Sequence, residues 1–89
     1  MKENILKELR IQIENVIFQF ESDYRINNDF ENFLKDNCQI FKEKISKLTT
    51  DAIHKAISNN LSKDKEFMTK IINQNSESFE NLINKLLNK

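Results

Sequence analysis

The stretch ILKELRIQIENVIFQF, residues 5–20, repeats apolar side chains at intervals of three or four positions. Because an α-helix turns once in 3.6 residues, this spacing places the apolar side chains on one side of a helix. The members of this stripe are Ile5, Leu6, Leu9, Ile13, Val16, Ile17 and Phe20. The pattern predicts a helix over residues 3–22.

Two later segments repeat the same periodicity. The second stripe consists of Phe30, Leu34, Cys38, Phe41, Ile45, Leu48, Ala52 and Ala56, and it predicts a helix over residues 29–58. The third stripe consists of Met68, Ile71, Ile72, Phe79, Leu82, Ile83 and Leu86, and it predicts a helix over residues 63–88.

The segments between the stripes carry turn signals. Residues 22–28 concentrate side chains that compete for backbone hydrogen bonds, and either Asn28 or Asp29 is suited to cap the second helix. Residues 59–62 form the second expected turn, in which an asparagine adopts the left-handed conformation that glycine usually takes at a helix end. Ser62 is then the expected cap of the third helix.

The chain of 89 residues contains no glycine and no proline, the residues that most often interrupt helices. We therefore expect an all-α protein, an antiparallel three-helix bundle that forms a single helical domain over residues 1–89. The weak point is Thr49-Thr50-Asp51, where a break would give four helices. The apolar phase continues through this point, which favours one continuous or mildly kinked helix.

Asn75 interrupts the third apolar stripe. A buried asparagine at such a position is best known for fixing helix register or oligomeric state. The other interpretation is a boundary position from which the amide reaches water.

Charge gives little support to a nucleic-acid role. The 14 basic and 14 acidic side chains cancel, and no basic stripe is present. A modest cluster on the second predicted helix, Lys42, Lys44, Lys47 and Lys55, is interleaved with Glu43 and Asp51. This pattern is typical of a solvated helix face, so a nucleic-acid partner is disfavoured.

Reactive residues are sparse. Cys38 and His54 are the only cysteine and histidine, and along one helix they would lie roughly 24 Å apart, at about 1.5 Å per residue. That separation excludes a nucleophile–base pair within one chain, and a zinc site needs about four ligands. We expect no catalytic, cofactor-binding or metal-binding residues, no cofactor, no small-molecule substrate and no enzymatic activity.

The longest apolar run is Val16-Ile17-Phe18, far too short to span a membrane. With a single cysteine, which suits a reducing compartment, this run leads us to expect a soluble cytoplasmic protein without a membrane partner. Asn, Ile and Lys supply 37 of the 89 residues, a bias that indicates an A+T-rich genome.

Four large apolar side chains fall outside the main stripes. Ile11 and Phe18 lie nearly opposite the first stripe, and Phe33 and Ile40 are displaced from the second. In an antiparallel hairpin that turns near residues 25 and 26, Phe18 is level with Phe33 and Ile11 with Ile40. We therefore expect these residues to form one apolar patch that is covered either by the third helix or by another molecule.

These features favour a non-enzymatic protein-binding module that covers a surface of a partner protein or associates with itself. Small helical inhibitors, immunity proteins and antitoxins share this size and class, but no motif selects one of them. The alternative function is a small nucleic-acid-associated regulator that works as a dimer and aligns two copies of the lysine cluster.

Overall fold

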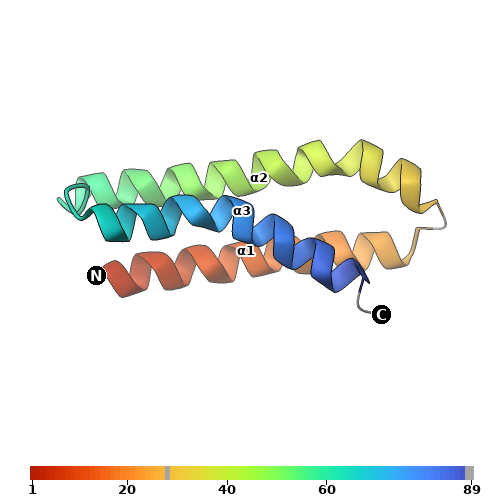
Figure 1. Ribbon diagram of the computed structural model, residues 1–89, viewed down its shortest axis with the longest axis horizontal. Coiled ribbons are helices and arrows are strands. Elements are labelled where there is room, and N and C mark those ends of the chain that lie inside the picture. The colour runs from red at the N-terminus through yellow and green to blue at the C-terminus, as the bar shows by residue number, and fades with distance from the viewer. Residues whose placement is uncertain (28, 88–89) are drawn as a thin grey trace.

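The computed structural model of the protein describes residues 1–27 and 29–87, and these residues form three helices that each contact the other two. The helices are α1 (Lys2–Arg25), α2 (Phe30–Ser58) and α3 (Lys65–Leu87). Consecutive helices run in opposite directions, so α1 and α3 begin at the same end of the molecule (Figure 1). No strand occurs in the described residues. The expected all-helical architecture with three packed helices is confirmed.

Helix α1 extends further than the sequence pattern predicts. The expected end at residue 22 is wrong, because α1 continues to Arg25. Two side-chain pairs stabilise this last turn: Arg25 Nη2 donates to Glu21 Oε1 at 2.8 Å, and Gln19 Nε2 donates to Asp23 Oδ1 at 3.0 Å. Such pairs one helical turn apart favour the helix over the turn that the polar composition suggests.

Helix α2 begins where the sequence predicts and runs without interruption. The side chain of Asp29 accepts a hydrogen bond from the Asn32 N–H at 3.2 Å, so Asp29 is the cap; Asn28, the other candidate, lies outside the described residues, as does the side chain of Phe30. The helix passes through Thr49 and Thr50. The Thr49 hydroxyl bonds the Ile45 carbonyl at 2.9 Å, which satisfies this buried polar group within the helix.

The turn between α2 and α3 uses asparagine in place of glycine. Asn60 has a φ of 60°, the left-handed conformation that the sequence predicts. Its N–H bonds the Ile57 carbonyl at 3.1 Å, and the Leu61 N–H bonds the Ala56 carbonyl at 2.8 Å. These two bonds make a Schellman motif, which closes the end of α2.

The prediction that Ser62 caps the third helix is wrong. The carboxylate of Asp64 accepts from the Phe67 N–H at 3.1 Å, and α3 begins at Lys65. A carboxylate at this position also complements the positive end of the helix dipole, which a serine hydroxyl does not.

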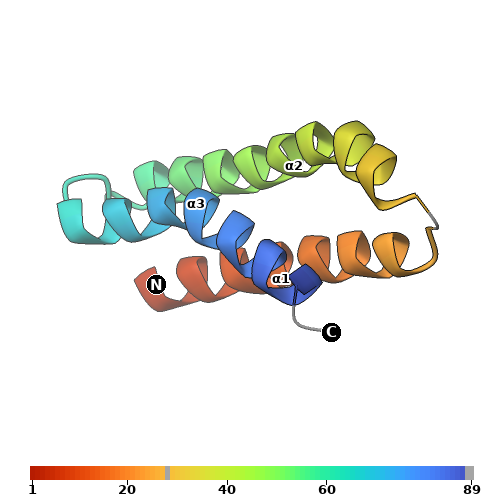
Figure 2. The same ribbon diagram turned by 45° about the vertical axis from the view of Figure 1, so that its right-hand side comes forward.

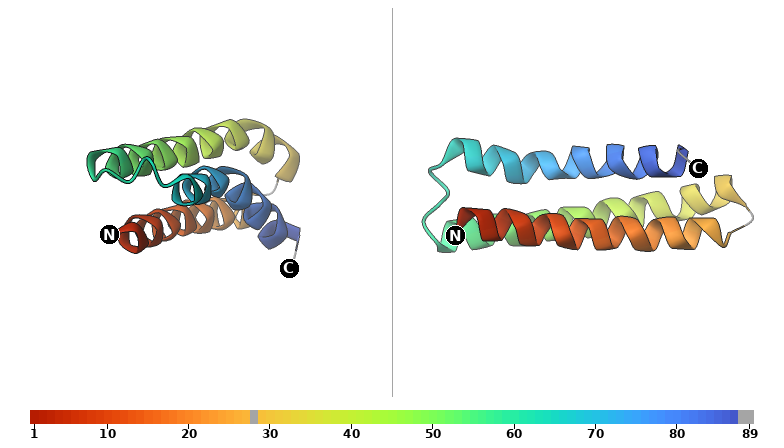
Figure 3. Two further views of the ribbon diagram at one scale, coloured as in Figure 1. Left: turned by 60° about the vertical axis from the view of Figure 1, so that its left-hand side comes forward. Right: turned by 90° about the horizontal axis from the view of Figure 1, so that it is seen from below.

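Helix α3 packs against both members of the α1–α2 hairpin (Figures 2 and 3). The buried apolar side chains of the three helices form one core cluster. An aromatic cluster fills one end, where the Phe20 ring lies 5.0 Å from that of Phe33 and 5.5 Å from that of Phe41. The buried apolar residues are Ile5, Leu9, Ile13, Ile17, Phe20, Phe33, Phe41, Ile45, Ala52, Ala56, Phe67, Ile71, Leu82 and Leu86.

The buried face of α3 differs from the apolar stripe of the sequence. Ile72, a member of that stripe, is 53% exposed, whereas Gln74 and Ser78 are buried. The buried polar groups are bonded within α3: Gln74 Nε2 donates to the Lys70 carbonyl at 3.3 Å, and the Ser78 hydroxyl donates to the Asn75 carbonyl at 2.8 Å. The face that α3 buries is therefore set by its contacts with two helices and includes positions that hydropathy alone assigns to solvent.

Candidate apolar binding face

Two large apolar side chains project from the side of α1 that faces away from the bundle. Ile11 is 49% exposed and Phe18 is 67% exposed. They stand seven residues apart, two helical turns, and so share one face of α1. Exposed charged side chains, Lys7, Glu14 and Arg25, border them. We call these five residues the outer face of α1.

Phe33 does not lie on an exposed surface. Its side chain is only 7% exposed and packs edge-on against Phe20. The expectation that Phe33 is displaced from the buried stripe is therefore wrong. The reason is that Phe33 lies on the side of α2 that faces α1, where Phe20 packs against it and Tyr24 lies at a ring distance of 6.2 Å.

Ile40 is 47% exposed, but it lies beside the groove between α1 and α2. It lines that groove with Val16, Phe20 and Asn37 among others. Ile11 lines a different hollow that has no residue in common with this groove. Of the four predicted residues, the structure thus leaves Ile11, Phe18 and Ile40 exposed and places Phe33 in the core.

The hollow beside Ile11 is built by α1 alone. It encloses about 260 Å³ and is lined by Glu3, Leu6, Lys7, Arg10, Ile11 and Glu14. Four of these residues stand at i, i+3, i+4 and i+7, the arrangement that receives a side chain of a facing helix in coiled coils. Leu6 packs against the core and gives the hollow an apolar floor. The outer face of α1 therefore offers both a projecting ring, Phe18, and a hollow of coiled-coil geometry.

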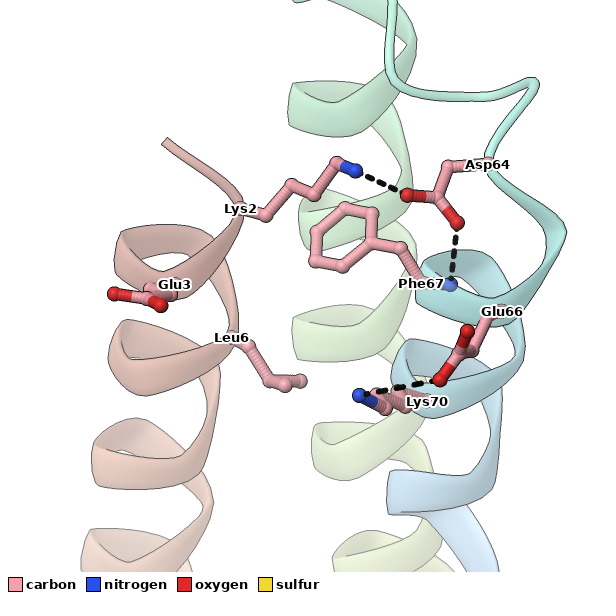
Figure 4. Close-up of a pocket in the computed structure, with 7 residues that line it drawn as sticks. All are labelled: Lys2, Glu3, Leu6, Asp64, Glu66, Phe67 and Lys70. Atoms are coloured by element: carbon pink, nitrogen blue, oxygen red, sulfur yellow. Dashed lines mark hydrogen bonds and ion pairs between the residues drawn. The ribbon is translucent and has the colours of Figure 1, made fainter.

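A second hollow of about 260 Å³ lies where α1 and α3 begin, and it is held together by charge. Lys2 forms an ion pair with Asp64, whose other carboxylate oxygen accepts from the Phe67 N–H (Figure 4). The hydrogen bond from Lys2, then that from the Phe67 backbone, holds the pKa of Asp64 below its ordinary value. These contacts fasten the first residues of α1 to the start of α3.

Two further charged groups of this hollow, Glu66 and Lys70, belong to α3. Glu66 and Lys70 lie 3.8 Å apart, one turn from each other on α3, and their side chains are more than half exposed (Figure 4). General acid–base chemistry needs a group whose pKa is shifted by a desolvated setting. Glu66 and Lys70 instead form an exposed pair within α3.

The groove between α2 and α3 borders a polar contact between these two helices. It encloses about 330 Å³, and Lys42 Nζ lies 5.4 Å from the centre of the Phe79 ring at its edge. Asn75 is an exposed residue, yet its Oδ1 accepts from the buried Thr49 hydroxyl at 2.9 Å. Asn75 therefore occupies the boundary of the bundle and reaches inward to α2.

The lysines of α2 are divided between its two sides. Lys42 borders the groove toward α3, whereas Lys44 and Lys55 line grooves toward α1. Lys55 Nζ also pairs with Glu8 Oε1 at 3.2 Å. Lys42 therefore lies on a different side of α2 from Lys44 and Lys55.

His54 and Cys38 both belong to the continuous helix α2, at an exposed and a half-buried position respectively. Sixteen residues of helix separate them by about 24 Å. Within the described residues, no three or more His, Cys, Asp or Glu side chains gather as a metal site would require. None of the helices in the described part of the chain combines the length and apolar character needed to cross a bilayer.

Comparison of the chain with protein-family models, with curated proteins and with solved structures finds no significant match.

Proposed function

We propose that this protein is a non-enzymatic binding module that covers a surface of a partner protein with the outer face of α1. The observation that carries the proposal is the position of Phe18, whose ring is 67% exposed on a well-formed helix. Aromatic side chains are enriched at protein interfaces because they bury a large area while losing few rotamers.

The surroundings of Phe18 support the same role. Interfaces commonly combine an apolar centre with a polar, solvated rim. On α1, Ile11 and Phe18 provide the apolar centre, and Lys7, Glu14 and Arg25 provide charges around it. Ile57 and Ile72, which are also exposed, lie on α2 and α3 and are not part of this face.

Such a module acts by occupying a surface that its partner needs for activity. A rigid helix presented by a bundle loses little conformational entropy on binding, which favours affinity. An inhibitory, immunity or antitoxin-like role is consistent with this mode of action.

The proposal is tested by affinity capture from the cells that produce the protein. Three immobilised chains are compared: the native chain, the variant Phe18→Asp, and the control Ile72→Asp, which alters an exposed apolar residue on α3. We expect the native chain and Ile72→Asp to retain the same partner protein and Phe18→Asp to lose it. Equal retention by all three chains would show that α1 does not provide the binding face.

The same three immobilised chains also test the alternative function, a nucleic-acid-associated regulator. Binding to nucleic acid releases counterions and therefore weakens steeply with salt. Retention on DNA or RNA that falls with salt concentration and is unaffected by Phe18→Asp would favour the nucleic-acid regulator instead.

A further inference from the structure

We infer that the outer face of α1 also binds the outer face of α1 in a second copy of the chain, with the two helices antiparallel. The inference rests on the proposed function, since it uses the same binding face and names one occupant for it. Three features of α1 specify this occupant and its register.

The first feature is the match between the projecting ring and the hollow. The hole formed by Lys7, Arg10, Ile11 and Glu14 is centred between residues 10 and 11. If two copies of α1 run antiparallel about a point near residue 14, Phe18 of each copy lies level with this hole in the other. Phe18 then enters the hole as a knob.

The second feature is the apolar pairing in that register. In the same reversal about residue 14, Phe18 of each copy lies within one position of Ile11 in the other, so the two apolar side chains are neighbours. A two-fold axis at this point makes the interface self-complementary, as closed dimers require.

The third feature is the order of charges along the edge of the face. Glu3 and Lys7 precede the centre, and Glu21 and Arg25 follow it. Reversal about residue 14 places Lys7 opposite Glu21 and Glu3 opposite Arg25, so every one of these contacts joins opposite charges. Complementary charges of this kind set orientation and partner choice between paired helices.

A parallel arrangement is disfavoured by the same residues. It would place Lys7, Glu14, Glu21 and Arg25 each opposite its own copy, and like charges in contact oppose association. In the antiparallel arrangement only Glu14, beside the two-fold axis, meets itself. The antiparallel dimer therefore carries one repulsive contact, and Glu14→Gln should strengthen it.

The inference is tested by exchanging charges between two variants. Lys7→Glu and Glu21→Lys each turn two attractive contacts of the symmetric dimer into repulsive ones. In a mixture of the two variants, the heterodimer joins opposite charges at every one of these contacts. Sedimentation over a concentration series should show self-association weakened roughly tenfold in each variant and restored in the mixture.

Controls separate folding from association. Glu21 pairs with Arg25 in its own helix, so circular dichroism and thermal melting of each variant verify that the bundle is intact. The matched charge reversals Lys47→Glu on α2 and Glu80→Lys on α3 change exposed residues outside the outer face of α1 and should leave association unchanged.

The outcomes distinguish this inference from the proposed function. Any of three results would overturn the antiparallel dimer. The native chain could stay monomeric over the whole concentration series, the mixture could associate no more tightly than either variant alone, or Glu14→Gln could associate no more tightly than the native chain. Loss of partner capture by Phe18→Asp would still support the proposed function in those cases. Conversely, restoration in the mixture together with undiminished partner capture by Phe18→Asp would support the dimer and contradict the proposed function.

Discussion

The hydroxyl of Thr49 on α2 bonds the Oδ1 atom of Asn75 on α3 at 2.9 Å, and this is a side-chain hydrogen bond that joins two helices of the bundle. Thr49 is 2% exposed, and its hydroxyl also lies 2.9 Å from the Ile45 carbonyl. A single hydroxyl proton is thus shared between an acceptor in its own helix and one in the neighbouring helix. The contact is specific to one alignment of α2 and α3, whereas apolar contacts tolerate sliding.

A double-mutant cycle should detect this contact. Thr49→Val and Asn75→Ala each remove one partner, and we expect a coupling free energy of about 0.5–1.5 kcal/mol from urea unfolding of the two single variants and the double variant. Neither single loss should be large, because Asn75 can reach water and Thr49 adds apolar surface on becoming valine. The exposed residues Thr50 and Asn73 provide a control cycle with no expected coupling. A coupling near zero for Thr49 and Asn75 would mean that the contact does not fix the alignment of α3.

Substitution of Phe18 should leave the stability of the fold nearly unchanged, whereas substitution of Phe33 should lower it strongly. Phe18→Asp changes an exposed residue, so the free energy of unfolding should stay within about 0.5 kcal/mol of the native value at concentrations where the chain is monomeric. Phe33→Ala removes a ring that packs against Phe20 and should cost about 3–5 kcal/mol. Both are measured by urea unfolding. A strongly destabilised Phe18→Asp variant would place that ring in the core and remove the basis for the binding face.

The Lys2–Asp64 pair should make stability depend on acidity. The folded state holds the pKa of Asp64 below its ordinary value. The ionised carboxylate therefore contributes fully to the free energy of unfolding when the pH is above that ordinary value, and this contribution is lost as the pH falls through the folded-state pKa. At neutral pH the native chain should have a higher melting temperature than the Asp64→Asn variant, since asparagine can still cap α3 but cannot form an ion pair with Lys2. The difference in melting temperature should shrink as the pH is lowered below about 4. A difference that persists unchanged in acid would show that the charge of Asp64 contributes nothing.

The left-handed residue of the second turn gives a further prediction. Asn60→Ala should lower the free energy of unfolding by about 1 kcal/mol, since a β-carbon without a local hydrogen-bonding group disfavours a φ of 60°. Asn60→Gly should be no less stable than the native chain, because glycine is the residue that this position of a Schellman motif favours. Thermal melting of the two variants side by side makes the comparison. Equal stability of the two would indicate that the turn relaxes to another conformation.

The sequence by itself determined the local structure of this protein. Apolar residues at intervals of three and four, without glycine or proline, are sufficient to specify three helices, because this periodicity matches the helical repeat. Asp29, one of two candidate caps, and Asn60, one of two asparagines in the second turn, take roles that the sequence allowed, since a cap and a left-handed residue depend on the chemistry of a few neighbouring positions. The sequence placed Ile11 and Phe18 opposite a long apolar stripe but left open whether the third helix covers them, and the structure leaves both exposed.

Only the tertiary structure decided which borderline positions are buried. Phe33 is covered because it packs against Phe20 and Tyr24 of α1. Ser78 is buried while Ile72 is exposed because α3 contacts two helices at once. Asp64 replaces Ser62 as the cap of α3 at a position where Lys2, 62 residues away in sequence, pairs with its carboxylate. In each case the energetic preference arises from a contact between distant segments, and helical periodicity carries no information about where a neighbouring helix will lie.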